Sequence, residues 1–164
     1  MALLAVVAAL SLLSGVAAEV VEVCVVGDVM DVYCINRGTL LDASSYRTLE
    51  HPGQHSIHCL VDVSFCYGSG FEILVPPTSG SDYCRAVRLD TAGRDAAMAM
   101  ARQSTSACST CTGPSSGPSK GFRATVRGTI DTASTASPPV LTTTSVEAAN
   151  VGCGGGPLHP PPLG

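Results

Sequence analysis

The feature that most constrains the fold is a long run of β-branched residues interrupted by one glycine. Residues 20–33, VVEVCVVGDVMDVY, are typical of a strand, because β-branched side chains pack well on a pleated sheet. Gly27 lies in the middle of this run, where a missing side chain permits a bulge or a sharp bend. We therefore expect one long, bent first strand that can serve two sides of a closed sheet.

Further strand-like segments and one helix follow this first strand. Residues 70–75, 83–90, 122–131 and 139–147 have strand-like composition, and the alternation is clearest in FRATVRGTID. Residues 93–103, GRDAAMAMARQ, are rich in Ala and Met and predict the helix. The order β-β-β-α-β-β predicts a mainly β chain, an OB-like five-stranded barrel with a long Cys/His-rich insertion after strand 1. An open antiparallel β-sandwich built from the same strands is the alternative.

Composition divides the chain into a leader, one domain and a tail. Residues 1–18 form an uncharged apolar run that ends in small residues and indicates a signal peptide, with a membrane anchor as the alternative. Residues 19–151 are long enough for a single β-barrel-like domain. Gly, Ser and Pro predict a flexible linker over 104–121 and a disordered tail over 152–164. We therefore expect a secreted protein, extracellular or in a periplasm-like compartment, with no membrane span after signal cleavage.

The protein has 8 cysteines, and all of them follow the leader. An even number of cysteines in an exported chain favours disulfides over free thiols, although the spacing does not give the connectivity. The disulfide candidates are therefore Cys24, Cys34, Cys59, Cys66, Cys84, Cys108, Cys111 and Cys153.

Residues 34–66 have no sustained hydrophobic period and predict a long excursion from the sheet. Cys59 and Cys66 flank LVDVSF, whose alternation predicts a short strand inside this excursion. We expect Cys34, Cys59 and Cys66 to pin the excursion to the end of the first strand through disulfides, mainly by restricting the unfolded chain.

A C-x-x-C pair, Cys108 and Cys111, follows the expected helix. In redox enzymes the first sulfur of such a pair lies at a helix N-terminus, which lowers its pKa, whereas this pair runs into Thr-Gly-Pro. We therefore expect a local staple, or bonds to Cys84 and Cys153, rather than redox catalysis.

Three histidines and a cysteine occur within residues 51–59, HPGQHSIHC. On a helical turn, spacings of four and three would place His51, His55 and His58 on one face, with Cys59 adjacent. Imidazole nitrogen and thiolate sulfur are suitable ligands for zinc or copper, so these four residues are candidate metal ligands. A Pro-Gly pair inside the stretch weakens the turn, and a histidine-bearing surface loop is the alternative.

The segment from Gly27 to Leu74 also resembles a group of small exported proteins. It reads G-D-V-M-D-V-Y-C, then H-S-I-H-C, then C-Y-G-S-G-F-E-I-L. This is similar to proteins of bacteria and microalgae that begin with G-x-V-x-D-x-x-C and continue with a His/Cys pair and a Gly-ended turn. The resemblance implies an OB-like fold without an established activity; the bacterial members more often have H-x-x-C, one residue shorter than here. The shared positions would be Gly27, Asp31, Cys34, His55, Cys59, Cys66 and Gly70.

Composition also narrows the function. A formal net charge of −4, no Trp and few other aromatic residues argue against a nucleic-acid partner. The sequence contains no assembled catalytic set, so a binding protein is expected before an enzyme. Our first hypothesis is an exported, disulfide-stabilised, non-enzymatic β-barrel module that binds a small ligand or an extracellular surface partner along the excursion. The alternatives are a small Zn or Cu protein, and a wall or matrix protein with O-linked sugars on residues 104–119 and 132–145.

Overall fold

The computed structural model describes residues 19–104 and 120–154, and its centre is a five-stranded mixed sheet that closes on itself. Its strands are β1 (Val20–Asp31), β2 (Phe71–Val75), β3 (Cys84–Leu89), β4 (Arg123–Asp131) and β5 (Val140–Ala148). They follow the order β1-β2-β3-β5-β4, and β4 returns to pair with β1. The pair β3–β5 is parallel and the other pairs are antiparallel. The chain is thus mainly β, as predicted, and the sheet is closed and mixed rather than open and antiparallel.

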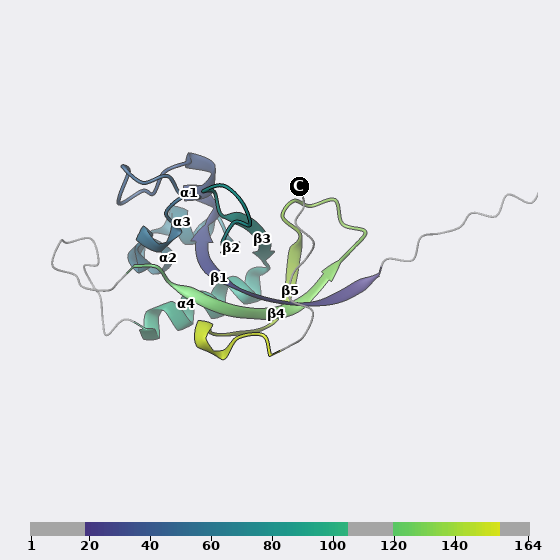
Figure 1. Ribbon diagram of the computed structural model, residues 1–164. Coiled ribbons are helices and arrows are strands. Elements are labelled where there is room, and N and C mark those ends of the chain that lie inside the picture. The colour runs from purple at the N-terminus through teal and green to yellow at the C-terminus, as the bar shows by residue number, and fades with distance from the viewer. Residues whose placement is uncertain (1–18, 105–119, 155–164) are drawn as a thin grey trace, which may run out of the picture.

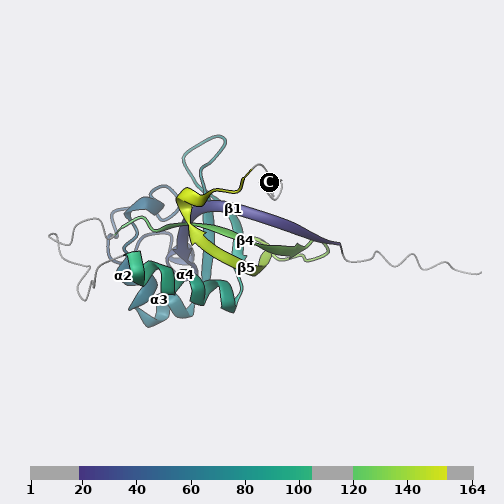
Figure 2. The same cartoon turned by 90° about the horizontal axis from the view of Figure 1, so that it is seen from below.

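Short helices gather at one end of the closed sheet, and one longer helix lies against its side. Figure 1 places α1, α2 and α3 together at one end of the sheet, and Figure 2 shows α4 running beside the sheet. The helices are α1 (Val32–Arg37), η1 (Pro52–Gln54), α2 (Ile57–Val61), α3 (Ser64–Gly68), α4 (Thr91–Ser104) and η2 (Ala149–Val151).

The first strand is long and bent, and it changes partners beside Gly27 (Figure 1). Up to Asp28, β1 pairs with β4; from Asp28 to Asp31 it pairs with β2. A Cβ atom on Gly27 would lie 2.3 Å from the carbonyl oxygen of Leu74, so a side chain at this position would collide with β2. The glycine therefore permits the close approach at which one strand changes partners.

The closed sheet encloses the main hydrophobic core, and α2 and α4 cover it. Val25, Ile73, Val87 and Val126 point into this core from four strands, together with apolar side chains of the two helices. A second, smaller core lies outside β1 and β2, where Met30 and Leu74 pack with residues of α1 and the loop after it. The segment between α1 and β2 is thus packed on the sheet through two separate apolar surfaces.

Helix α4 begins where Asp90 caps it. One carboxylate oxygen of Asp90 accepts the N–H of Gly93 at 2.8 Å, and the other accepts the N–H of Thr143 at 3.2 Å. A side-chain acceptor at this position satisfies a backbone donor that the first helical turn leaves free. The same carboxylate therefore starts α4 and ties it to β5.

Two local predictions differ from the structure. Residues 60–65, predicted as a short strand, instead comprise the end of α2, the start of α3 and two residues between these helices. Their alternation is short, and Ser56 caps α2 through its hydroxyl. The ordered chain also continues beyond residue 151, since Cys153 is buried in a disulfide. Most of the predicted linker and of the predicted tail lies outside the described residues.

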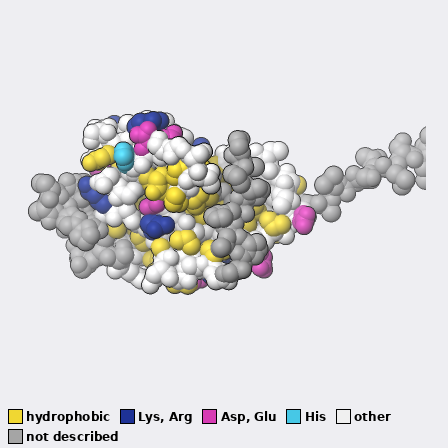
Figure 3. Space-filling view, in the orientation of Figure 1, with side chains coloured by type: hydrophobic (Ala, Val, Ile, Leu, Met, Phe, Trp, Pro, Cys, Tyr) yellow, Lys and Arg dark blue, Asp and Glu magenta, His cyan; other side chains and the backbone are white. Residues whose placement is uncertain are grey.

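The outer surface carries scattered charge. On the face seen in Figure 3, Lys and Arg side chains form separate spots, with Asp and Glu side chains between them. Within the described parts of the chain, no helix has the length and apolar character needed to cross a membrane.

Candidate functional site: a buried thiol–imidazole centre

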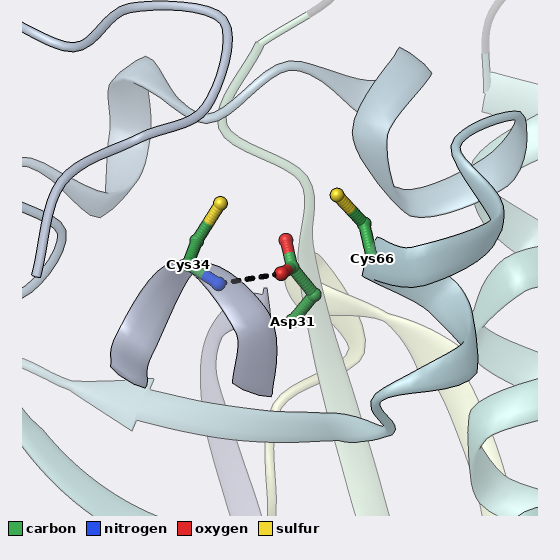
Figure 4. Close-up of side chains that lie close together, drawn as sticks. All are labelled: Asp31, Cys34 and Cys66. Atoms are coloured by element: carbon green, nitrogen blue, oxygen red, sulfur yellow. Dashed lines mark hydrogen bonds between the residues drawn. The ribbon is translucent and has the colours of Figure 1, made fainter. Parts of the chain in front are cut away.

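The site is built at the point where β1 passes into α1. Asp31, the last residue of β1, caps the helix: its Oδ1 accepts the N–H of Cys34 at 2.7 Å (Figure 4). Aspartate is among the best N-cap residues because its carboxylate replaces the missing backbone acceptor. This bond places the Cys34 side chain near the Asp31 carboxylate, and both residues are fully buried.

Two further cysteines occupy the same position in their own short helices. Ser56 caps α2, and its hydroxyl accepts the N–H of Cys59 at 3.3 Å. In α3 the carbonyl of Val63 accepts the N–H of Cys66 at 2.9 Å. Each of the three cysteines is therefore the third residue of a helix of five or six residues. Repetition of this arrangement brings three thiols from separate elements to one place.

His55 enters the site from the turn between η1 and α2. Its Nε2 lies 2.7 Å from Asp31 Oδ2, and its side chain is only 2% exposed. Its backbone carbonyl accepts the N–H of Gly121 at 2.9 Å, which fixes the turn against the start of the segment leading into β4. Among the described residues, neither imidazole nitrogen has a hydrogen bond of regular geometry, so a buried polar side chain here is incompletely satisfied.

The side chains meet in a compact group. The donor atoms of Asp31, Cys34 and Cys66 lie within 4.8 Å of one another, and Figure 4 shows both sulfurs and the carboxylate directed to one region between α1 and α3. Cys34 and Cys59 each interact with Cys66 and with His55. We call Cys34, His55, Cys59 and Cys66 the thiol–imidazole centre, with Asp31 beside it.

The neighbours of each thiol determine its acidity. Interactions with Cys66 and then His55 outweigh burial and lower the pKa of Cys34 to about 7. The same partners, together with Ser56, lower the pKa of Cys59 to about 5. Cys66 donates to both, so its own pKa is raised far above the ordinary value. The three thiols thus titrate as one coupled group that favours thiolate at Cys34 and Cys59.

The imidazole of His55 is held in its charged form when the centre is empty. Burial opposes the charge, but contact with Asp31, and further contacts with Cys34 and Cys59, raise the pKa of His55 well above its ordinary value. A buried imidazolium between a carboxylate and thiolates is a charge arrangement that a bound cation could replace. Three thiols and one imidazole are also ligands that Zn and Cu prefer.

The structure brings together two of the four predicted metal ligands. His55 and Cys59 belong to the centre, whereas the imidazole of His51 packs against Tyr46 with ring centroids 5.2 Å apart. His58 is 3.2 Å from Asp62 at the surface. The single helical turn needed to align the histidines does not form, because η1 ends at Gln54 and α2 starts only at Ile57. The predicted ligand set at His51 and His58 is therefore corrected.

The disulfide predictions are also met only in part. Cys24 bonds to Cys153, with a Cα–Cα distance of 5.8 Å, so Cys153 is not available to the C-x-x-C pair. Cys34, Cys59 and Cys66, which we expected to form disulfides, are free and buried thiols. Cys84 is free and exposed. Cys108 and Cys111 lie outside the described residues.

The pattern of spacing alone missed Asp31 as a partner of the centre. A usable signal was present: D-x-x-C at residues 31–34 and S-x-x-C at residues 56–59 both read as a helix cap followed by a cysteine. Of the positions named by the resemblance, Asp31, Cys34, His55, Cys59 and Cys66 lie together in the structure.

The other two positions of that set are glycines near the centre. Gly27 marks the bend of β1, and Gly70, with φ of 90°, ends the turn before β2. The carbonyl of Gly70 accepts the N–H of Val32 at 3.0 Å, which joins the start of α1 to the start of β2.

Compared with known proteins, the chain matches no protein-family model, no curated protein and no solved structure.

Proposed function

We propose that this chain is a small exported metalloprotein that holds a zinc- or copper-class ion in the thiol–imidazole centre. Its role is binding rather than catalysis. The observation that carries the proposal is the His55 imidazole, 2% exposed, lacking a regular hydrogen bond and in contact with the buried thiols of Cys34 and Cys59. An incompletely satisfied buried imidazole costs free energy, and an ion at the centre would satisfy the nitrogen that Asp31 does not contact.

The fold and the compartment are part of the same proposal. The closed strand order β1-β2-β3-β5-β4, with α4 between β3 and β4, supports an OB-type barrel. The apolar leader and the Cys24–Cys153 disulfide support export. Free thiols can persist in an oxidising compartment when they are buried and bound to metal, which agrees with the exposures of 0–1% at Cys34, Cys59 and Cys66.

Metal analysis of the mature protein tests this proposal. The secreted chain, purified without chelator, should carry about one zinc or copper ion per chain in elemental analysis. His55→Ala and the conservative Cys59→Ser should each abolish this content, because each removes a ligand. His51→Ala and His58→Ala are matched histidine controls, and Cys84→Ser is the matched thiol control; all three should retain the metal.

Two results would overturn it. One is a folded, metal-free protein that takes up neither zinc nor reduced copper. The other is a native mass map in which Cys34, Cys59 or Cys66 is bonded to another cysteine, because a bridged sulfur cannot serve as a thiolate ligand.

A further inference from the structure

We infer that the ion is divalent and four-coordinate, of the zinc class, and that it acts as a folding clamp in a closed site. Its ligands are Sγ of Cys34, Cys59 and Cys66 and Nδ1 of His55. This inference rests on the proposed metal site and adds the identity, geometry and role of the ion.

The side chains of the centre leave four donor atoms for a metal. Asp31 uses Oδ1 for the N–H of Cys34 and places Oδ2 2.7 Å from His55 Nε2. With Nε2 directed at this carboxylate, Nδ1 is the nitrogen left for a metal. A carboxylate behind a metal-bound histidine is a recurrent arrangement, since it fixes the orientation of the imidazole. Asp31 is therefore a positioning residue, and the inner shell is three sulfurs and one nitrogen.

Burial then decides between an open and a closed site. The exposed fractions are 0% for Cys34 and Cys66, 1% for Cys59 and 2% for His55. Catalytic zinc sites have three protein ligands and keep one position for water or substrate, whereas structural sites use four protein ligands. Four buried protein donors complete a tetrahedral shell and leave no such open position.

Charge favours a divalent over a monovalent ion. Three thiolates and the Asp31 carboxylate bring four negative charges into a buried volume. The carboxylate of Asp31 forms its ion pair with His55. A bound metal requires neutral Nδ1, so the imidazole no longer offsets this charge. Zn²⁺ neutralises one charge more than Cu⁺, and uncompensated buried charge is costly.

The role of the ion follows from the elements that it joins. Helices α1, α2 and α3 contain six, five and five residues. Isolated helices of this length are not stable in water, since nucleation costs more than a single turn returns. An ion bound by one residue from each, and by His55, would cross-link the end of β1 to the whole segment over residues 32–70.

Cobalt loading tests the geometry, and hydrogen exchange tests the role. The reduced mature protein, titrated anaerobically with Co²⁺ alone, should bind about one ion and develop the visible bands of tetrahedral cobalt and thiolate charge-transfer absorption. Added azide should leave these bands unchanged, because no coordination position is open. Zn²⁺ should then slow amide exchange across residues 32–70 by at least tenfold, while exchange in β4 and β5 stays unchanged. Cys59→Ser should weaken Co²⁺ binding at least tenfold, and Cys84→Ser should not.

The outcomes separate this inference from the proposed function. Tight binding of Cu⁺ with only weak, octahedral Co²⁺ binding would keep the metalloprotein and overturn the divalent, four-coordinate ion. Bands that shift with azide would overturn the closed site. Amide exchange rates across residues 32–70 that are the same with and without Zn²⁺ would overturn the folding role. If neither Co²⁺, Zn²⁺ nor Cu⁺ binds to the reduced, folded protein, the proposed function itself fails.

Discussion

A single carboxylate, that of Asp31, joins backbone structure to the chemistry of the centre. One oxygen starts α1 through the N–H of Cys34, and the other contacts the imidazole of His55. The first bond fixes the position of Cys34 at the start of α1. The second contact directs Nε2 of His55 at the carboxylate, so that Nδ1 is the nitrogen left for the thiols. Both effects come from one side chain at the last position of β1.

Replacing Asp31 by Asn should separate these two effects. Asparagine caps helices about as well as aspartate, so α1 should still form. The amide carries no charge to orient and polarise His55, so zinc affinity should fall about 10- to 100-fold. Competition with a chromophoric chelator measures this change, and circular dichroism checks that the fold is retained.

Asp28→Asn is the matched control for that experiment. Asp28 is also a buried carboxylate on β1, but its ion-pair partner is Arg123, at 3.8 Å. The zinc affinity of the Asp28→Asn variant should match that of the unchanged protein. An equal loss of zinc affinity in both variants would show that any negative charge on β1 supports the ion and that the contact with His55 is not required.

The three histidines show how far residue-level reasoning from sequence reaches. His51, His55 and His58 have the same chemistry, and their spacing fits one helical face. What distinguishes His55 is burial beside Asp31, a residue 24 positions earlier in the chain. Local pattern cannot report a contact between segments so far apart, so the sequence could indicate a ligand-rich stretch but not its true members.

At the level of elements, β1 is a feature that the sequence does predict, unlike the membership of the histidines in the site. A long β-branched run with one central glycine predicts a bent strand, and the structure has a long strand that changes partners beside that glycine. The strands β2 to β5 and helix α4 were also predictable, since each carries a sustained period or a strong composition. The helices α1, α2 and α3 were not, because elements of five or six residues carry too little periodicity and depend on caps.

Gly27→Ala should destabilise the protein through this bend. The added Cβ would lie 2.3 Å from the Leu74 carbonyl oxygen and 2.7 Å from Cγ2 of Ile73. Since β1 cannot move away without losing its pairing, overpacking should lower the free energy of unfolding by about 2 kcal/mol. Gly68→Ala is the control, because nothing lies within 4 Å of its added Cβ. Urea unfolding of the two variants compares them; equal midpoints would contradict a steric role for Gly27.

At the scale of the whole molecule, a disulfide and a metal site would restrain two separate positions on β1, one within the strand and one at its C-terminal end. The disulfide joins Cys24 to Cys153, whereas the thiol–imidazole centre lies at Asp31, roughly 20 Å further along the strand at 3.3 Å per residue. One link holds the C-terminal segment to the closed sheet, and the other would hold the residues between α1 and β2.

The disulfide and the metal centre should contribute to stability independently. Cys24 and Cys153 are 129 positions apart, and closing so long a loop restricts the unfolded chain strongly. The double variant Cys24→Ala/Cys153→Ala should lower the free energy of unfolding by about 4 kcal/mol. Its metal content should stay unchanged, because distant sites with no shared partners act additively. Denaturant titration and elemental analysis of the same sample give both values, with Cys84→Ser as the single-thiol control. Loss of the ion from the double variant would show that β1 couples the disulfide to the metal centre.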